Sequence, residues 1–216
     1  MKRLALLVAT LMLALTASAQ QKGVVAGFTA SNTSLRHLDR DVFDSDAVGH
    51  FHLGLTYNLP LFAGISLQPE ILYNRKGTIM TKIADDPSKV TMSYLELGVQ
   101  AQLDILPSRG RIYGFVEPYV GYCLTDKFKQ MDFRAHNRWY YLNKLEGGFA
   151  LGAGIQLFDD LQLSGKVFWN LGTLYDAEGH MDFNDAKAHV VTGITQLFKG
   201  GNSFNGLSLS LVYFFD

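Results

Sequence analysis

Six charged side chains fall on the polar faces of segments whose opposite faces are apolar. They are Glu70, Glu96, Glu117, Lys76, Arg111 and Lys166. Carboxylates and cations that share an enclosed space must pair, because an unpaired buried charge is costly. Such a set can form a hydrogen-bonded plug, or it can line a narrow pore or a path for protons or ions. We expect a lumen charge network that acts as a plug, with the pore as the alternative.

The sequence gives little support for a metal site or for catalysis. His50 and His52 share a face of an extended segment, but a metal site would need a third ligand, and no Cys or carboxylate stands at ligand spacing. No G-x-S-x-G, H-E-x-x-H or P-loop pattern occurs. Acidic clusters at 37–46 and 176–182 are typical of solvated loops. We therefore predict no metal, no cofactor and no enzymatic activity.

The charged residues belong to segments with a side-chain period of two, which indicates β-strands. In the final segment, GLSLSLVYFFD, Leu207, Leu209 and Leu211 alternate with Ser208 and Ser210. Eight strands are predicted near residues 24–31, 48–59, 65–76, 91–103, 111–124, 145–157, 161–172 and 206–215. Most approach or exceed the about 9 to 11 residues of a transmembrane strand.

The connections between these strands alternate in length. Links at 60–64, 104–110 and 158–160 are short, whereas those at 32–47, 77–90, 125–144 and 173–205 are long. Short periplasmic turns and long extracellular loops are typical of outer-membrane barrels. We predict an all-β, closed, antiparallel, up-and-down transmembrane barrel of eight strands. A soluble periplasmic barrel or sandwich, with its apolar face inside, is the alternative fold.

Outward aromatic residues fit this orientation. Tyr57, Tyr213 and Phe215 are expected near the periplasmic rim, and Tyr73 and Trp169 near the outer rim. Aromatic residues gather at both interfaces of a bilayer. We therefore predict that these five side chains form an aromatic girdle.

Composition and the N-terminus indicate export. Lys2 and Arg3 precede an apolar stretch at 4–15 and the small residues Ala17-Ser18-Ala19, which is the layout of a cleavable signal peptide. We assign residues 1–19 to the signal peptide and 20–216 to a barrel domain in the outer membrane. Charged residues make up only 18%, against about 25% in soluble domains. The net charge of −1 argues against an electrostatic nucleic-acid binder.

Two features leave the strand count open. Pro69 and Pro118 lie within predicted strands, where each is expected to mark a bulge or a local break. The segment AKAHVVTGITQLF, residues 186–198, has enough apolar content for another strand or a short helix. Ten strands are therefore the alternative to eight.

Several short motifs carry a family resemblance. They are Gly23 to Gly27 (GVVAG), Gln68-Pro69-Glu70 with Tyr73 and Lys76-Gly77, Tyr94-Leu95-Glu96, and Gly152-Ala153-Gly154. With them, the sequence resembles the PorT-like outer-membrane β-barrel family of Gram-negative bacteria. The resemblance implies an eight-stranded barrel that accepts Pro69. Gly98 stands where a proline is common, and the fourth loop is longer than usual. The family is defined by architecture, so no activity transfers with it.

These observations lead to one functional hypothesis and its alternatives. We expect a non-enzymatic, monomeric barrel whose extracellular loops bind a protein partner, a surface glycan or a lipid head group. Its surroundings would be outer-membrane lipid and lipopolysaccharide. A small porin-like channel for ions or small solutes is the first alternative, and it would require an open lumen.

Overall fold

The computed structural model describes residues 21–33, 43–82, 88–106, 111–129, 145–171 and 204–215. These residues form eight strands: β1 (Gln21–Thr33), β2 (Phe43–Pro60), β3 (Ile65–Lys82), β4 (Ser88–Leu106), β5 (Ile112–Lys129), β6 (Leu145–Gln156), β7 (Leu161–Asn170) and β8 (Phe204–Phe215). The predicted signal peptide lies outside the described residues. Among the described residues, no helix is long and apolar enough to span a membrane.

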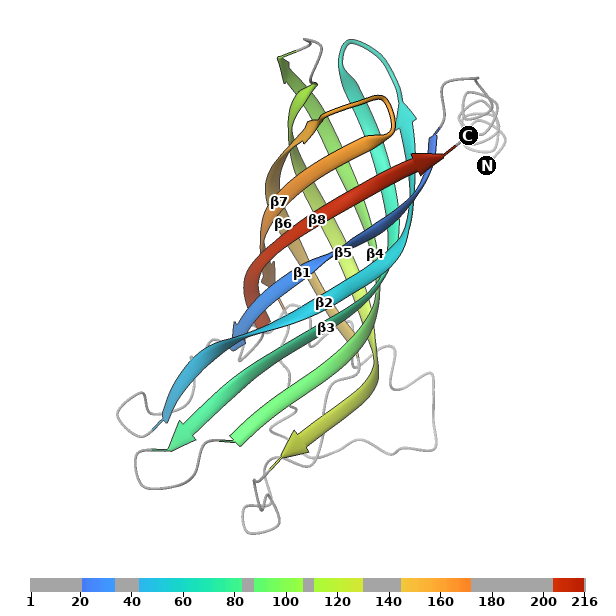
Figure 1. Ribbon diagram of the computed structural model, residues 1–216. Helices are drawn as coiled ribbons and strands as arrows, with labels where there is room; N and C mark the ends of the chain where they lie inside the picture. The colour runs from blue at the N-terminus through green and yellow to red at the C-terminus, as the bar shows by residue number, and fades with distance from the viewer. Residues whose placement is uncertain are drawn as a thin grey trace, which may run out of the picture.

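The strands form a closed ring (Figure 1). Each strand pairs antiparallel with the next, and β8 returns to pair with β1, for example Val25 with Val212. Where all eight strands are paired, closure leaves no row of unpaired backbone groups, which hydrocarbon would not tolerate. The predicted eight-stranded barrel is confirmed. Because β7 pairs directly with β8, two further strands would have to open this ring. The segment 186–198 lies outside the described residues.

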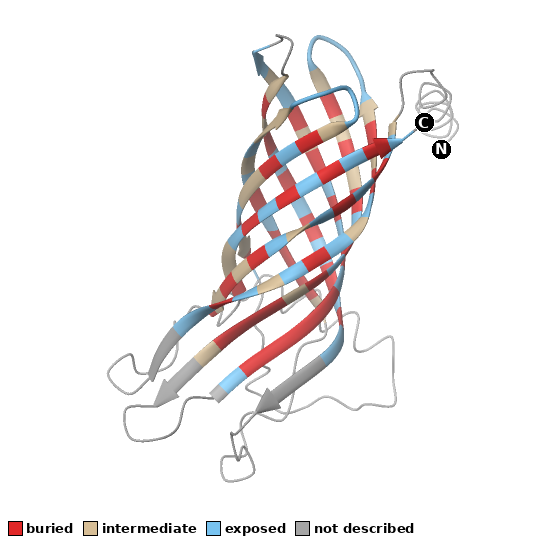
Figure 2. Cartoon of the chain, viewed as in Figure 1, coloured by how far each residue is buried: buried red, intermediate tan, exposed pale blue. Residues whose placement is uncertain are grey.

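Buried and exposed residues alternate along the strands (Figure 2). On β8, Leu207 and Leu209 are 60% and 57% exposed, whereas Ser208 and Ser210 are buried. Apolar side chains thus cover the outside and polar side chains fill the inside, the reverse of a water-soluble barrel. The alternation found in the sequence therefore belongs to a lipid-facing wall.

Strands β2 to β5 are longer than the sequence pattern predicts. They contain 18 or 19 residues, against 10 to 12 in β6 to β8, and they project beyond the barrel at the end opposite the termini (Figure 1). The backbone ladder continues through pairs such as Ile79 with Lys89. Polar residues such as Lys89 occupy the outer positions there, so the hydrophobic alternation ends before the hydrogen-bonded ladder does.

Each strand proline interrupts the ladder on one side only. Pro69 stays in register with Val99, and Pro118 with Phe149. On the other side of each proline, pairing is missing for two residues and then resumes in the same register. Proline has no backbone N–H, so it loses one hydrogen bond to one neighbouring strand, while its pairing with the strand on the other side is unaffected. The prolines therefore cause local gaps, while the bulges lie elsewhere, for example between Ala47 and His52.

Two of the short turns are built alike. In the β2–β3 turn, Leu61 N donates to Ile65 O and Ile65 N donates to Phe62 O, both at 2.9 Å. The β6–β7 turn at 157–160 repeats both bonds at 2.9 and 3.4 Å. Ala63 and Gly64 have φ angles of 49° and 75°, which reverse the chain within four residues. Such tight turns hold neighbouring strands in one register.

Candidate functional site in the barrel interior

The charged side chains of the interior come from five consecutive strands. Inward positions of β3 to β7 supply two lysines and four glutamates: Glu70, Lys76, Glu96, Glu117, Glu146 and Lys166. Successive side chains of a strand point to opposite faces, so residues separated by an even number of positions lie on the same face. These six residues therefore point inward, together with the other buried residues of their strands. They form two separate groups, each with one lysine and two glutamates.

The first, the Lys76 group, contains Lys76, Glu96 and Glu146. Lys76 Nζ lies 2.8 Å from Glu96 Oε1 and 2.7 Å from Glu146 Oε1, and its side chain is 1% exposed. Asn74 Nδ2 donates to both Glu96 oxygens at 3.1 Å, and Asn170 Nδ2 donates to Glu146 Oε2 at 2.7 Å. The two carboxylates therefore hold the lysine and are themselves held by amides.

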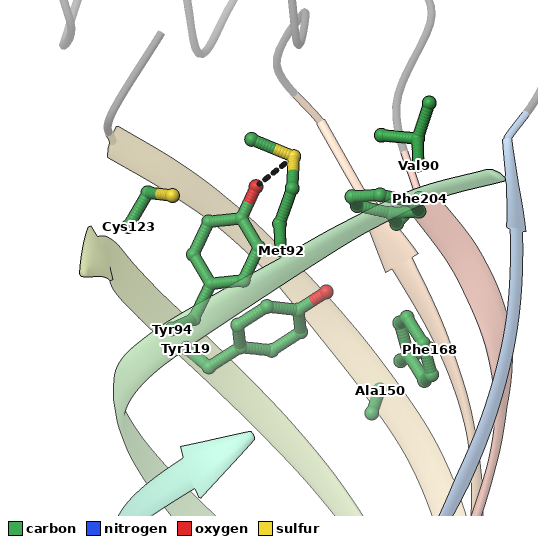
Figure 3. Packing of buried hydrophobic residues seen from close by; sticks show 8 residues of the cluster. All are labelled: Val90, Met92, Tyr94, Tyr119, Cys123, Ala150, Phe168 and Phe204. Atoms are coloured by element: carbon green, nitrogen blue, oxygen red, sulfur yellow. Dashed lines mark hydrogen bonds between the residues drawn. The ribbon is translucent and has the colours of Figure 1, made fainter. Parts of the chain in front are cut away.

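Aromatic rings enclose the same lysine. Lys76 Nζ lies 5.4, 4.9 and 4.8 Å from the ring centroids of Tyr94, Tyr119 and Phe168. These rings belong to a hydrophobic cluster (Figure 3) made of Val90, Met92, Tyr94, Tyr119, Cys123, Ala150, Phe168 and Phe204. Tyr94 and Phe204 pack edge to face with centroids 6.5 Å apart. An apolar seal thus lies beside the charged group.

The second, the Lys166 group, contains Lys166, Glu70 and Glu117. Lys166 Nζ lies 2.6 and 2.8 Å from the two Glu117 oxygens and 3.1 Å from Glu70 Oε1. Gln100 Nε2 donates to Glu70 Oε2 at 3.1 Å. The Lys166 side chain is 9% exposed, against 1% for Lys76, whereas the carboxylates of both groups are buried.

Arg111 belongs to neither group. It pairs with Asp104 and donates to Ser66 Oγ at 2.7 Å and to Gln102 Oε1 at 3.0 Å. These residues lie at the end of the barrel that carries the termini, beside a hollow of about 370 Å³. The sequence predicts Arg111 to lie with the glutamates, because the alternation of side chains does not give height along the barrel.

Glu146 was missed by the sequence analysis. It stands at the start of β6, where LEGG offers two glycines and no clear alternation. Glu146 lies on the same face of the strand as Gly148, Ala150 and Gly152, and the large apolar Phe149 lies on the opposite face. This alternation could have predicted that Glu146 points inward.

Two inward glycines make room for the carboxylates. A Cβ at Gly98 would lie 2.8 Å from Glu117 Oε1, and one at Gly121 would lie 2.7 Å from Glu146 Oε1. Real Cβ atoms do not approach heavy atoms this closely, so glycine permits the large side chain on the next strand. The small residues and the glutamates are therefore parts of one packing arrangement.

The histidines are engaged in different ways. His52 is buried, with Nδ1 2.9 Å from Thr29 Oγ1 and Nε2 2.9 Å from Ser210 Oγ. The Nε2 atom of His50 is buried without a partner. Within the described residues, no group of three or more His, Cys, Asp or Glu side chains could hold a metal ion.

The five aromatic residues of the predicted girdle lie at outward positions of four strands. Tyr57 and Phe215 both pair with Lys22, and Tyr213 pairs with Leu161, at the end of the barrel that carries the termini. Tyr73 and Trp169 lie toward the other end, where Tyr73 contacts Phe51 and Trp169 contacts Phe149 at centroid distances of 6.2 and 5.2 Å. The assignment of these residues to lipid interfaces remains a prediction.

The match to a protein family agrees with this architecture. Residues 18–176 match the family described as outer membrane protein beta-barrel domain. Among solved structures, the chain is similar to the outer membrane protein OprG from Pseudomonas aeruginosa, with 11% identity, a TM-score of 0.45, and 91% of this chain and 94% of that chain covered. No curated protein matches the sequence. Because the family match covers well over half of the chain, the protein belongs to the outer membrane protein beta-barrel domain family and is an outer-membrane barrel.

Proposed function

We propose that this protein is a non-enzymatic barrel with a plugged interior, whose extracellular loops bind a protein partner, a glycan or a lipid head group. The observation that carries the proposal is the pairing of the charged residues in the described interior. Lys76, Lys166 and Arg111 each contact at least one carboxylate of the same chain. An eight-stranded barrel is only wide enough for its side chains to fill.

Pairing of this kind argues against chemistry inside the barrel. A catalytic or transport group needs a polar atom that can turn toward a substrate, and here the charged atoms are held by other side chains at 2.5 to 3.1 Å. The hydrophobic cluster around Lys76 further obstructs passage toward the extracellular end. We therefore place the activity of the protein on its loops and outer wall.

The loops that would bind a partner lie outside the described residues, so their assignment rests on sequence. Residues 127–144 are basic and aromatic, whereas 37–46 and 176–182 are acidic. We also propose membership of the PorT-like group, a monomeric state, and removal of residues 1–19 on export. Amino-terminal sequencing of the protein from outer membranes should begin at Gln20.

Planar bilayer recordings test the plug. The wild-type barrel should show no steady conductance at moderate voltage, whereas a variant that carries Lys76→Ala, Phe168→Ala and Phe204→Ala should show openings. A matched triple variant on the outer wall, Leu97→Ala, Val167→Ala and Leu209→Ala, controls for general loosening. A conducting wild-type barrel would contradict the plug and favour the channel.

A narrow channel for small solutes is the second candidate. Gln68, Tyr113 and Gln162 have buried polar atoms without a protein partner, which are positions that water can occupy. The hollow beside Arg111 lies at the same end of the barrel as these residues. The conductance measurement separates this function from the first.

Loop replacement tests partner binding. Cells that display barrels with residues 130–144 or 172–203 exchanged for a Gly-Ser linker should lose binding to the partner, glycan or lipid that wild-type cells retain. The same change at the periplasmic turn 107–110 should leave binding intact. Equal binding by all three variants would rule out the loops as the binding surface.

A further inference from the structure

The outer wall of β3 to β5 changes from apolar to polar at one level. On β4, the outward residues from Leu103 to Leu95 are mostly exposed and apolar, and the next outward residues are Ser93 and Thr91. In the register, Arg75 of β3 pairs with Ser93, and Ser93 pairs with Thr125 of β5. This row lies on the side of the long loops, where outer-leaflet head groups begin.

A hollow of about 110 Å³ occupies this boundary. It is lined by Tyr73, Arg75, Thr91, Ser93 and Thr125, and we call it the outer hollow. Its volume is several times the about 30 Å³ that one water molecule fills in the liquid. Tyr73 OH donates to Ser93 Oγ at 3.0 Å, which fixes one edge of the hollow.

Among the described residues, the cation of the outer hollow has no carboxylate partner. Arg75 forms no ion pair with any described residue, and its Nε atom is buried without a hydrogen-bond partner. Its guanidinium carbon lies 5.8 Å from the centroid of the Phe51 ring, which holds the side chain in place. A desolvated donor that lacks a partner is costly, and Arg75 also borders the hollow, so an acceptor that enters the hollow would meet an unpaired cation.

The neighbouring rows are rich in lysine. In the register, Thr91 pairs with Lys127, and the exposed Lys89 pairs with Lys129. Asp46 of β2 pairs with Ile79, and Ile79 pairs with Lys89. The outer hollow therefore lies beside two rows whose sequence contains three lysines and one aspartate.

We propose that the outer hollow binds a phosphate group of an outer-leaflet phosphoglycolipid, the lipid A portion of lipopolysaccharide. A guanidinium matches phosphate oxygens in a bidentate geometry, and the hydroxyls of Thr91, Ser93 and Thr125 are further donors. The Phe51 and Tyr73 rings lie just below and contact the acyl region. This site is on the barrel wall, so the inference does not depend on what the loops bind.

Binding of lipid A to the full-length barrel tests the site. Native mass spectrometry of the purified barrel in detergent gives dissociation constants for bisphosphorylated lipid A and for the same lipid after enzymatic dephosphorylation. Wild-type protein should bind the phosphorylated form at least about tenfold more tightly, because one charge-assisted hydrogen bond contributes enough free energy for a change of that size in the dissociation constant. Arg75→Ala should lose this preference, and Arg75→Lys should keep part of it.

Matched variants separate the site from general electrostatics. Lys22→Ala removes one exposed cation at the periplasmic end and should leave the preference unchanged. Ser93→Ala with Thr125→Val keeps Arg75 and should reduce affinity severalfold, which supplies a second test if Arg75→Ala folds poorly. Equal losses for Lys22→Ala and Arg75→Ala would overturn the proposal. So would displacement of lipid A by millimolar inorganic phosphate, because the hollow would then be a site for free phosphate.

Discussion

Arg75 and Lys76 are consecutive residues of β3, but their side chains lie on opposite sides of the barrel wall. Lys76 contacts two carboxylates and three aromatic rings of its own chain. Arg75 lies over one ring and pairs with no described carboxylate. The chain neutralises the cation in the interior and leaves the cation on the exterior for a partner. Position relative to the wall, rather than residue type, thus separates a structural charge from a binding charge.

Removal of the interior cation should have the largest effect on stability. Lys76→Met leaves Glu96 and Glu146 buried without their counter-ion, and we expect the free energy of unfolding to fall by about 3 to 5 kcal/mol. Urea unfolding in phospholipid vesicles, followed by tryptophan fluorescence, measures this change. Adding Glu96→Gln and Glu146→Gln should restore most of the stability. A loss below about 1 kcal/mol from Lys76→Met would show that water hydrates the two carboxylates once the lysine is gone.

The Lys166 group allows the same test with a more exposed lysine. Lys166→Met leaves Glu70 and Glu117 without a cation, and the lysine side chain is 9% exposed, against 1% for Lys76. Because water can reach the position that Lys166 vacates, hydration of the two carboxylates should limit the loss to about 2 to 3 kcal/mol. The same urea titration ranks the two variants, and Glu117→Gln added to Lys166→Met should recover part of the loss. The reverse ranking would contradict the role given to burial.

The glycines beside the glutamates should tolerate little added volume. Gly98→Ala places a Cβ 2.8 Å from Glu117 Oε1, and we expect a loss of about 1 to 3 kcal/mol from overpacking. Gly165→Ala is the matched control, because the nearest atom there is 3.8 Å away. Thermal unfolding, read from the heat-dependent shift on SDS gels, should separate the two variants. Equal melting temperatures would mean that Glu117 moves aside without cost.

Much of the fold follows from the period of two. Alternation of Leu207, Leu209 and Leu211 with serines predicted strands with one apolar and one polar face, and the alternating lengths of the connections favoured a membrane barrel with the apolar face outside. The strand ends were harder to predict, because the ladder of β3 and β4 continues through Ile79 and Lys89, where alternation has ceased. Hydrogen bonding of the backbone leaves no trace in the hydropathy pattern there.

The candidate sites were predicted only in part, for a different physical reason. The alternation along a strand predicts whether a side chain lies inside or outside the barrel. The pairing of Lys76 with Glu146, by contrast, joins residues 70 positions apart and depends on the register between strands. The outer hollow likewise requires Arg75, Ser93 and Thr125 to share a row, and a shift in register at Ser93 helps to set that row. Such relations come from packing and cannot be counted along one strand.

Removal of the exterior cation should have the smallest effect on the barrel itself. Arg75→Ala takes away no ion pair between described residues, so in vesicles without lipopolysaccharide we expect a change within about 0.5 kcal/mol. The two variants, Lys76→Met and Arg75→Ala, each remove one positive charge from adjacent residues, so a large difference between them reports chiefly the surroundings of each charge. Addition of lipid A should then stabilise the wild-type barrel, because a ligand that binds only the folded state raises its stability as its concentration exceeds the dissociation constant. The Arg75→Ala barrel should gain less, and the same urea titration with and without lipid A measures both effects. A large loss from Arg75→Ala in the absence of lipid A would mean that the residue is structural, and the contrast between the two neighbours would fail.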